Sequence, residues 1–405
     1  MNRRLAGWRH DFPALEVRPH GRRLAYLDSA STSLKPRAVI DAVLHVFAHQ
    51  AGNVHRGVHF LSEAATAAYD AVRAQVARFI GAAEPDEIVF TSGTTDAINL
   101  VAHAWGRPRV SRGDAVVVTA LEHHSNLVPW QLLCAERGAE LRVAPIDRDG
   151  RVELDAFAAL LDERVKLVAV SHLSNVVGTV APIAEIARRA HAVGAVVLVD
   201  GAQAIVHLPI DVAALGCDFY AFSGHKLYAP TGTGVLWGRA ALLDAMPPWK
   251  AGGEMVASVD AQGARFRAPP ARFEAGTPNI AGVIGLGAAL AYLGSIDRAA
   301  TIDHERAVHA HLREAIAAVP GVRVLGAPEA AVVAFTVEGV HPHDVATIVD
   351  REGVAIRSGH HCAEPLHHAL GHQASARASL ALYNDADDVA QLIAALARVR
   401  EVMSA

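Results

Sequence analysis

Short runs of β-branched and other apolar residues alternate with helical patterns between residues 85 and 240, and this alternation restricts the possible fold more than any other feature. The stretches Leu127 to Arg137 and Ile183 to Val193 place apolar residues at helical spacing. Strands that alternate with such helices predict an α/β fold, with a mostly parallel sheet covered by helices on both faces. The runs with the length and composition of buried strands are Ala115 to Thr119, Glu140 to Pro145, Lys166 to Ser171, Ala195 to Asp200, Phe219 to Ser223 and Gly234 to Gly238.

Composition and charge limit the classes of function that this chain can have. A chain of 405 residues with 52% hydrophobic and 20% charged residues has ample apolar material for a folded protein of two or three domains, or of one large domain with a satellite. The net charge of -5 provides no broad positive field, so we expect no nucleic-acid partner. No apolar stretch is long enough to span a bilayer, and no apolar leader follows the charged start. We therefore expect no membrane partner and a cytoplasmic location.

The alternating pattern ends near residue 247. From Pro247 to Pro278 the chain is rich in Gly, Pro and Arg and too irregular for a core element, which indicates a long functional loop. A helical stretch from Ile280 to Leu293 follows, and then helices mix with short strands such as Val322 to Leu325 and Ala330 to Val337. This mixture predicts a second α+β domain.

Polar residues close the predicted strands, and ligands of open α/β sheets bind at that edge. One strand ends in Asp200, with Gln203 shortly after it, and the next ends in Ser223, followed by His225 and Lys226. A carboxylate for a pyridine nitrogen and a lysine for an aldehyde carbon are what pyridoxal 5'-phosphate requires of its protein. Taken singly, these residues could be a capping acid and a solvated lysine. Taken together, in a chain where lysine is rare, they favour a pyridoxal-phosphate site.

Three other polar segments add candidate groups. The loop Thr91 to Thr95, with Thr94 and Thr95 at its end, opens a helix and could hold a phosphate, although Ser and Thr also favour this position as caps. His123, just after a predicted strand, could stack on a flat ring and transfer protons. Asn175 could bind the cofactor or a substrate carboxylate, or it could simply shape a turn.

One cysteine lies in a polar loop, Arg357 to Pro365, with the sequence RSGHHCAEP. Its arginine and histidines favour the thiolate of Cys362. Cys134 and Cys217 lie among apolar residues instead, as inert core thiols do. The chain has only three cysteines and no paired spacing between them, which argues against a disulfide framework. The histidines could alternatively bind zinc, but their spacing matches no tetrahedral set. The guanidinium group of Arg377 could bind a substrate carboxylate through two parallel N–H groups, or it could form a surface salt bridge.

Five motifs occur along the chain: EHHSNLVPWQ, VDGAQA, SGHKLYAPTGTGVLWG, FEAGTPN and RSGHHCAEPL. Together they resemble the SUF-system (group II) cysteine desulfurases and selenocysteine lyases, which belong to the class V aminotransferases and are fold-type I pyridoxal-phosphate enzymes. The resemblance runs from about residue 20 to the C-terminal end. It implies a seven-stranded, mostly parallel sheet in a large domain. The expected divisions are an N-terminal segment at 1–20 that packs near the small domain, a large domain at 21–280, and a small α+β domain at 281–405.

The resemblance also implies roles for the site residues. Lys226 would hold the cofactor covalently, Asp200 would meet its pyridine nitrogen, and Thr277 would reach the phosphate bound by the other subunit of a homodimer. The implied cofactor-binding set is Lys226, Asp200, Gln203, His123, Thr94, Thr95, Ser223, His225, Thr277 and Asn175. The implied substrate-binding set is Arg377, Asn175, Arg357 and His55, and the implied catalytic set is Cys362, Lys226 and His123.

The implied reaction takes sulfur from L-cysteine, or selenium from L-selenocysteine, and releases alanine. Lys226 would remove the Cα proton, and the Cys362 thiolate would receive the sulfur as a persulfide. An acceptor protein would then collect the sulfur for iron–sulfur clusters or another pathway. Two alternatives stay open: another pyridoxal-phosphate reaction on the same scaffold, such as transamination or kynureninase-like cleavage, and a non-enzymatic metal or iron–sulfur scaffold built on the histidine-rich loop. The cysteine desulfurase reaction requires no metal, whereas the metal or iron–sulfur scaffold requires bound metal.

Overall fold

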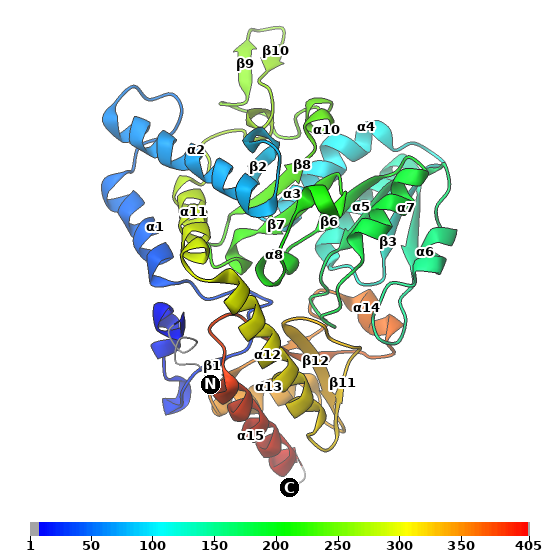
Figure 1. Ribbon diagram of the computed structural model, residues 1–405. Coiled ribbons are helices and arrows are strands. Elements are labelled where there is room, and N and C mark those ends of the chain that lie inside the picture. Colours follow the sequence, from blue (N-terminus) through cyan, green and yellow to red (C-terminus); the bar gives the residue numbers. More distant parts are fainter. Residues whose placement is uncertain (1–7, 404–405) are drawn as a thin grey trace.

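Seven strands form one sheet in the larger part of the computed structural model, which describes residues 8–403 (Figure 1). Among these described strands only β8 runs antiparallel to its neighbours, and the other pairs are parallel. The predicted α/β class and the seven-stranded, mostly parallel sheet are therefore confirmed. In order across the sheet the strands are β2 (Ile88–Thr91), β8 (Gly234–Gly238), β7 (Phe219–Ser223), β6 (Val196–Asp200), β5 (Val165–Ser171), β3 (Ala115–Thr119) and β4 (Glu140–Ala144).

Both faces of this sheet are buried. Successive side chains of a strand point to opposite sides, so each strand contributes to the cores on both faces. In β3, Ala115 and Val117 belong to the core on one face, whereas Val116 and Val118 belong to the core on the other. The first core includes side chains of α2 (Phe60–Ile80), α7 (Ile183–Ala192) and α11 (Ile280–Ser295). The second includes side chains of α3 (Thr94–Leu100) and α5 (Val128–Arg137). Strand residues that are apolar on both faces are the sequence cause of this three-layer arrangement.

The register of the parallel strands brings their carboxyl ends to one edge. Ser171, at the end of β5, is paired with Asp200, at the end of β6, and Asp200 is paired with Ala221 of β7. The residues that follow these strands therefore meet at this edge, as the sequence predicts.

A second, four-stranded antiparallel sheet forms the lower part of the molecule in Figure 1. Helices α12, α13 and α15 pack against this sheet and share a core with it. The predicted α+β region is therefore present. Its strands, in order, are β11 (Val322–Val324), β12 (Val332–Val337), β15 (Ser375–Ser379) and β14 (Arg357–Gly359), and its helices are α12 (Arg298–Ala317), α13 (Pro342–Arg351) and α15 (Ala386–Met403).

The N-terminal region connects the two parts. β1 (Ala25–Tyr26) pairs with β13 (Val354–Ala355) of the small domain, and Phe12 packs on Tyr383 with ring centroids 4.7 Å apart. Residues 1–7 of the expected segment lie outside the described range. Helix α11, which follows the predicted boundary between the two domains, packs on α1 (Arg37–His49) and α2.

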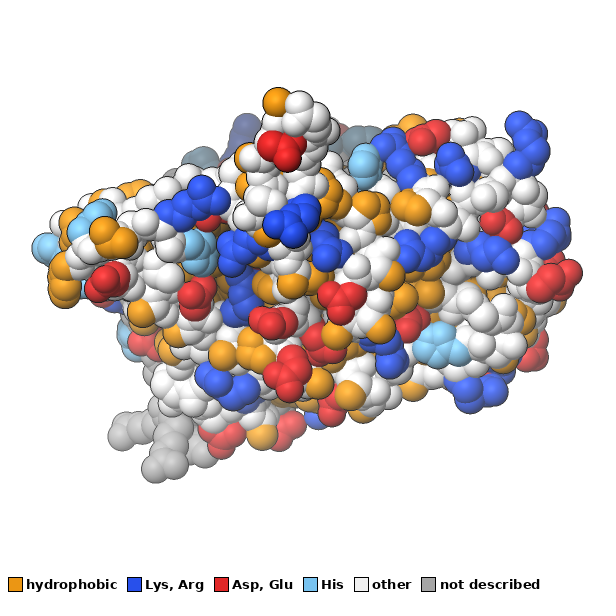
Figure 2. Space-filling view, turned by 90° about the horizontal axis from the view of Figure 1, so that it is seen from above, with side chains coloured by type: hydrophobic (Ala, Val, Ile, Leu, Met, Phe, Trp, Pro, Cys, Tyr) orange, Lys and Arg blue, Asp and Glu red, His pale blue; other side chains and the backbone are white. Residues whose placement is uncertain are grey.

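The irregular passage 247–278 contains a hairpin, β9 (Val256–Val259) and β10 (Ala264–Phe266), that projects at the top of Figure 1. Its residues are almost entirely exposed. Lys and Arg side chains gather around its base in the view from above (Figure 2). Within residues 8–403, no single helix has both the length and the apolar composition of a membrane span.

Candidate active site

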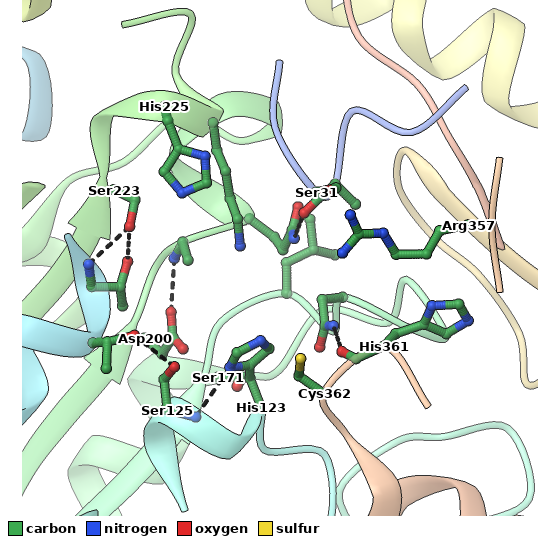
Figure 3. A pocket seen from close by; sticks show the side chains of 18 of the residues that line it. Ser31, His123, Ser125, Ser171, Asp200, Ser223, His225, Arg357, His361 and Cys362 are labelled. Carbon is green, nitrogen blue, oxygen red and sulfur yellow. Dashed lines mark hydrogen bonds between the residues drawn. The ribbon is translucent and has the colours of Figure 1, made fainter. Parts of the chain in front are cut away.

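A cavity lies at the carboxyl edge of the large sheet and extends to the small domain. It brings together residues as far apart in the chain as Ala30 and Arg377, and Figure 3 shows several side chains pointing into one space. The predicted site residues that line it are Thr94, Thr95, His123, Asn175, Asp200, Gln203, Ser223, His225, Lys226, Arg357, Cys362 and Arg377.

Lys226 and Asp200 lie at the ends of neighbouring strands. Burial lowers the pKa of Lys226 to about 8, and the attraction of Asp200 only partly opposes this effect. Burial likewise raises the pKa of Asp200, whose Oδ1 accepts a hydrogen bond from the Ala202 amide over 2.9 Å. An amine with a depressed pKa keeps a substantial free-base fraction near neutral pH, so Lys226 can act as a nucleophile and a base.

His123 is a neutral ring with a defined proton position. Burial lowers its pKa to about 3, with a further contribution from the nearby charge of Lys226. Its Nδ1 accepts from the Ser125 amide over 3.0 Å, so the ring proton is on Nε2. A neutral imidazole of this kind can stack on a flat ring and donate from Nε2.

Glu122, next to His123, supports the same turn, although no sequence pattern marked it as a site residue. Its buried carboxyl accepts from Thr119 Oγ1 (2.6 Å), Asn126 Nδ2 (2.6 Å), Ser171 N (3.1 Å) and Ser171 Oγ (2.7 Å). Burial raises its pKa to about 7, and the four hydrogen bonds oppose that rise. Glu122 therefore ties the end of β3 to the end of β5.

Hydroxyl groups gather where a phosphate is expected. Ser223 Oγ accepts from the Thr94 amide over 2.8 Å and lies 2.7 Å from Thr94 Oγ1. Thr95 Oγ1 lies 2.7 Å from Ser125 Oγ. Burial lowers the pKa of His225 to about 4, so its ring is neutral near pH 7.

The peptide before Lys226 is held by a segment that the sequence did not indicate. The carbonyl oxygen of His225 accepts from Ser33 N (3.1 Å), Ser33 Oγ (3.0 Å), Thr32 Oγ1 (3.2 Å) and Lys35 Nζ (2.9 Å). Burial lowers the pKa of Lys35 to about 8. These contacts fix the backbone from which Lys226 extends. The rarity of lysine was the one signal in the sequence that could have drawn attention to Lys35.

Arg377, on β15, is 2% exposed and lies at the wall of the cavity. Its Nη1 donates to the Asn175 carbonyl over 3.0 Å and its Nη2 to Asp28 Oδ1 over 3.1 Å, while Nε has no partner among residues 8–403. Two of the five guanidinium N–H groups are thus used, which leaves donors for a carboxylate. Asp28 also faces Arg357, whose Nε lies 3.4 Å from Asp28 Oδ2. Asp28, which the sequence analysis did not select, therefore pairs with two arginines.

Asn175 and Cys362 are linked through the reactive loop. The Asn175 amide nitrogen donates to the His361 carbonyl over 2.7 Å, so this group anchors the loop in addition to lining the cavity. Cys362 is exposed, between β14 and α14 (Glu364–Ala369), and its sulfur points toward His123 in Figure 3. Cys134 and Cys217 are buried, and burial raises their thiol pKa values to about 11 and about 12.

Two expected residues lie outside this cavity. His55 is exposed, with its ring against Tyr69 at a centroid distance of 5.8 Å. Thr277 is also exposed, and its Oγ1 lies 3.5 Å from Asn53 Nδ2. Thr277 borders a separate cavity, so within one chain neither residue reaches the space beside Lys226. The expectation that His55 lines the site therefore does not hold for a single chain.

The residues present fit pyridoxal 5'-phosphate. The cavity offers an amine of depressed pKa, a buried carboxyl, a neutral flat ring and a cluster of hydroxyls, which match the aldehyde, ring nitrogen, ring face and phosphate of that cofactor. Within residues 8–403, no three His, Cys, Asp or Glu side chains are arranged to hold a metal ion.

A parallel sheet with these groups at its carboxyl edge defines the class of fold-type I pyridoxal-phosphate enzymes. The family described as aminotransferase class V matches residues 25–392, and the chain belongs to that family. Its members use pyridoxal 5'-phosphate.

Relatives cover the whole chain. A cysteine desulfurase of Cronobacter sakazakii is 50% identical over 98% of each chain, and one of Dickeya dadantii is 51% identical over 98% of this chain and 96% of that protein. The crystal structure of the cysteine desulfurase CsdA from Escherichia coli matches with a TM-score of 0.93 and 42% identity over 99% of each chain. A 24%-identical structure with glycine covalently linked to its pyridoxal phosphate shares the fold, with a TM-score of 0.83 over 96% of this chain and 98% of that chain.

Proposed function

We propose that this protein is a cysteine desulfurase that converts L-cysteine to L-alanine and receives the sulfur on Cys362 as a persulfide. The observation that carries this proposal is that the exposed thiol of Cys362 and the amine of Lys226 line one cavity, beside Asp200 and His123. Relatives named cysteine desulfurase cover 98% of the chain at 50% and 51% identity.

The residues of the cavity can each take one part of this reaction. Bound pyridoxal 5'-phosphate supplies an electron sink for the bonds at Cα of an amino acid. The free amine of Lys226 can take the Cα proton, and the unused N–H groups of Arg377 can hold the substrate carboxylate. Neutral His123 can donate a hydrogen bond from Nε2.

The sulfur transfer balances without an external oxidant. The Cys362 thiolate attacks the substrate sulfur, an S–S bond forms, and the Cβ–S bond breaks. The bonding electrons stay on Cβ, which takes up a proton and becomes the methyl group of alanine. The products are alanine and a Cys362 persulfide, which an acceptor thiol can then reduce or collect.

The direct test is mass spectrometry of the cofactor-loaded protein after brief incubation with cysteine in the absence of reductant. We expect one added sulfur on the peptide that contains Cys362, together with an equal amount of alanine. Cys362→Ala should abolish both while retaining the cofactor absorbance. Alanine without sulfur on Cys362 would indicate a lyase that releases sulfur directly, and absence of both products would favour another reaction of the class V enzymes.

The finer assignment to the SUF-system branch is part of the proposal. The compact loop from Gly359 to Pro365 is its support, and in that branch a sulfur-acceptor protein stimulates turnover. Selenocysteine lyase activity, delivery to an acceptor protein for iron–sulfur clusters and the cytoplasmic location remain predictions. Comparing turnover with and without an acceptor of this branch tests the assignment, because a chain from another branch should show no stimulation.

We also propose a homodimer in which Thr277 serves the cavity of the partner. Its support is that Thr277 is exposed and lies outside the cavity of its own chain. The test mixes Lys226→Ala protein with Thr277→Val protein under exchange conditions. If Thr277 acts across the dimer, each mixed dimer has one intact site and activity returns. No recovery would mean that Thr277 acts within its own chain or not at all.

A further inference from the structure

The backbone of the reactive loop adopts a conformation that residues with a Cβ disfavour. His361 has a φ of 51° and Cys362 a φ of 57°, both in the left-handed region. Two such residues in succession persist only when the surroundings hold them. Two anchors come from the large domain: Asn175 Nδ2 donates to the His361 carbonyl over 2.7 Å, and the His124 amide donates to the Cys362 carbonyl over 2.7 Å.

A third anchor comes from the small domain through side chains. Nε2 of His361 and Nε2 of His367 each lie 3.0 Å from Oγ of Ser375, on β15. Nδ1 of His367 lies 3.0 Å from the Ala363 carbonyl oxygen. His361 is 6% exposed, and His367 and Ser375 are 0% exposed. One buried hydroxyl therefore joins the residue before Cys362 to a histidine of α14.

The partners fix the direction of each hydrogen bond in this chain of groups. A carbonyl oxygen only accepts, so Nδ1 of His367 carries the proton, and Nε2 of the neutral ring accepts from the Ser375 hydroxyl. That hydroxyl has one proton, so Nε2 of His361 must donate to Oγ. Burial lowers the pKa of both rings, that of His361 to about 2, which supports the neutral forms. Each of the three side chains is needed for this arrangement.

We propose that His361, Ser375 and His367 are positioning residues, whose hydrogen bonds hold the left-handed backbone of the loop and so direct the sulfur of Cys362 into the cavity. Figure 3 shows the imidazole of His361 on the side of the loop away from His123, while the sulfur lies on the side facing it. The ring nitrogens of His361 and His367 therefore act through the backbone and touch no substrate. The proposal rests on the proposed function only for the identity of the reaction.

The test is Ser375→Ala in the cofactor-loaded protein, by hydrogen exchange without substrate and by turnover of cysteine. The amides to follow are those of His124 and Ala363, because they donate to the carbonyls of Cys362 and His360. The Ser375 hydroxyl makes two buried hydrogen bonds, and loss of the one that holds His361 should raise the exchange of these amides by about 10-fold. We expect kcat to fall by a similar factor, about 10-fold, with KM and the cofactor absorbance unchanged, since the carboxylate site is untouched.

A matched control is Thr301→Val, which removes another buried hydroxyl of the small domain, bonded to the Arg298 carbonyl over 2.8 Å. It should lower the melting temperature and leave loop exchange and kcat as they are. The proposal is overturned if Ser375→Ala behaves like this control. If Ser375→Ala does not fold, His367→Phe keeps the ring and removes the nitrogens, and the same outcomes apply. Faster exchange in a protein that does not turn over cysteine would support the positioning role and contradict the proposed function.

Discussion

Replacing Lys226 with methionine should stabilise the protein in the absence of cofactor. Burial lowers the pKa of this amine from 10.5 to about 8, so at pH 7 the folded state carries an ammonium that its surroundings disfavour. At about 1.4 kcal/mol for each pH unit between the two pKa values, this costs about 3 kcal/mol. The attraction of Asp200 is already part of that value, since it opposes the effect of burial. Lys226→Met removes the charge and shortens the unbranched side chain by only one atom.

The pH dependence gives this prediction its sign. Between pH 8 and 10.5 the unfolded chain holds the Lys226 proton and the folded chain has lost it, so wild-type stability rises with pH in that window. The advantage of Lys226→Met should therefore be about 3 kcal/mol below pH 8 and fade as the pH approaches 10.5. Urea unfolding of the cofactor-free proteins at pH 7 and pH 10 measures both values.

The control variant is Lys250→Met, because Lys250 is half exposed and paired with Asp96 at 3.0 Å. Its removal should give no gain at either pH. If Lys226→Met is no more stable than the wild type at pH 7, or if its advantage is the same at pH 10, then the buried ammonium is not the source of the cost and the reasoning is wrong.

Three further predictions follow from the same site. Glu122→Gln should lower the free energy of unfolding by about 1–3 kcal/mol in urea titrations at pH 5, because the new amide faces a donor that needs an acceptor; the loss should shrink by pH 8, where burial disfavours the ionised carboxylate of the wild type, and an equal loss at both pH values would refute the reasoning. Arg377→Lys should raise KM for cysteine by about 10- to 100-fold in steady-state assays with a smaller effect on kcat, and an unchanged KM would exclude carboxylate binding there. Brief iodoacetamide treatment at pH 7.5 should label Cys362 and spare Cys134 and Cys217, which peptide mass spectrometry can check, because burial disfavours their thiolates.

The parts of the site that sequence analysis identified share one physical cause. Asp200, Ser223 and Lys226 follow buried parallel strands, and the carboxyl ends of such strands meet at one edge whatever the details of the packing. Strand β2 was not among the predicted strands, although the run Glu87-Ile88-Val89-Phe90-Thr91 carries the required β-branched pattern. Only the polar loop that follows β2 was predicted, as a phosphate site.

The groups that sequence analysis missed act over long separations and leave no local pattern. Asp28 reaches Arg377 and Lys35 reaches the His225 carbonyl only after the N-terminal region has packed between the two domains. The use of the Asn175 amide as an anchor for the reactive loop also depends on tertiary structure. His361 was part of a motif, but its bond to Ser375 required the register of β14 on β15, which pairs Gly359 with Ser375.

Lys226 and Cys362, the two reactive groups, are held in position in different ways. Lys226 extends from a strand end fixed by several hydrogen bonds, whereas Cys362 lies in a loop whose two left-handed residues cost about 1–2 kcal/mol each. That cost is offset by anchors from both domains, Asn175 and His124 on one side and Ser375 on the other. The direction of the sulfur therefore depends on how the small domain sits on the large one. Because reacting atoms must meet within about 3–3.5 Å, a displacement of about 1 Å between the domains would slow sulfur transfer, and it would also move Arg377 of the small domain relative to Lys226.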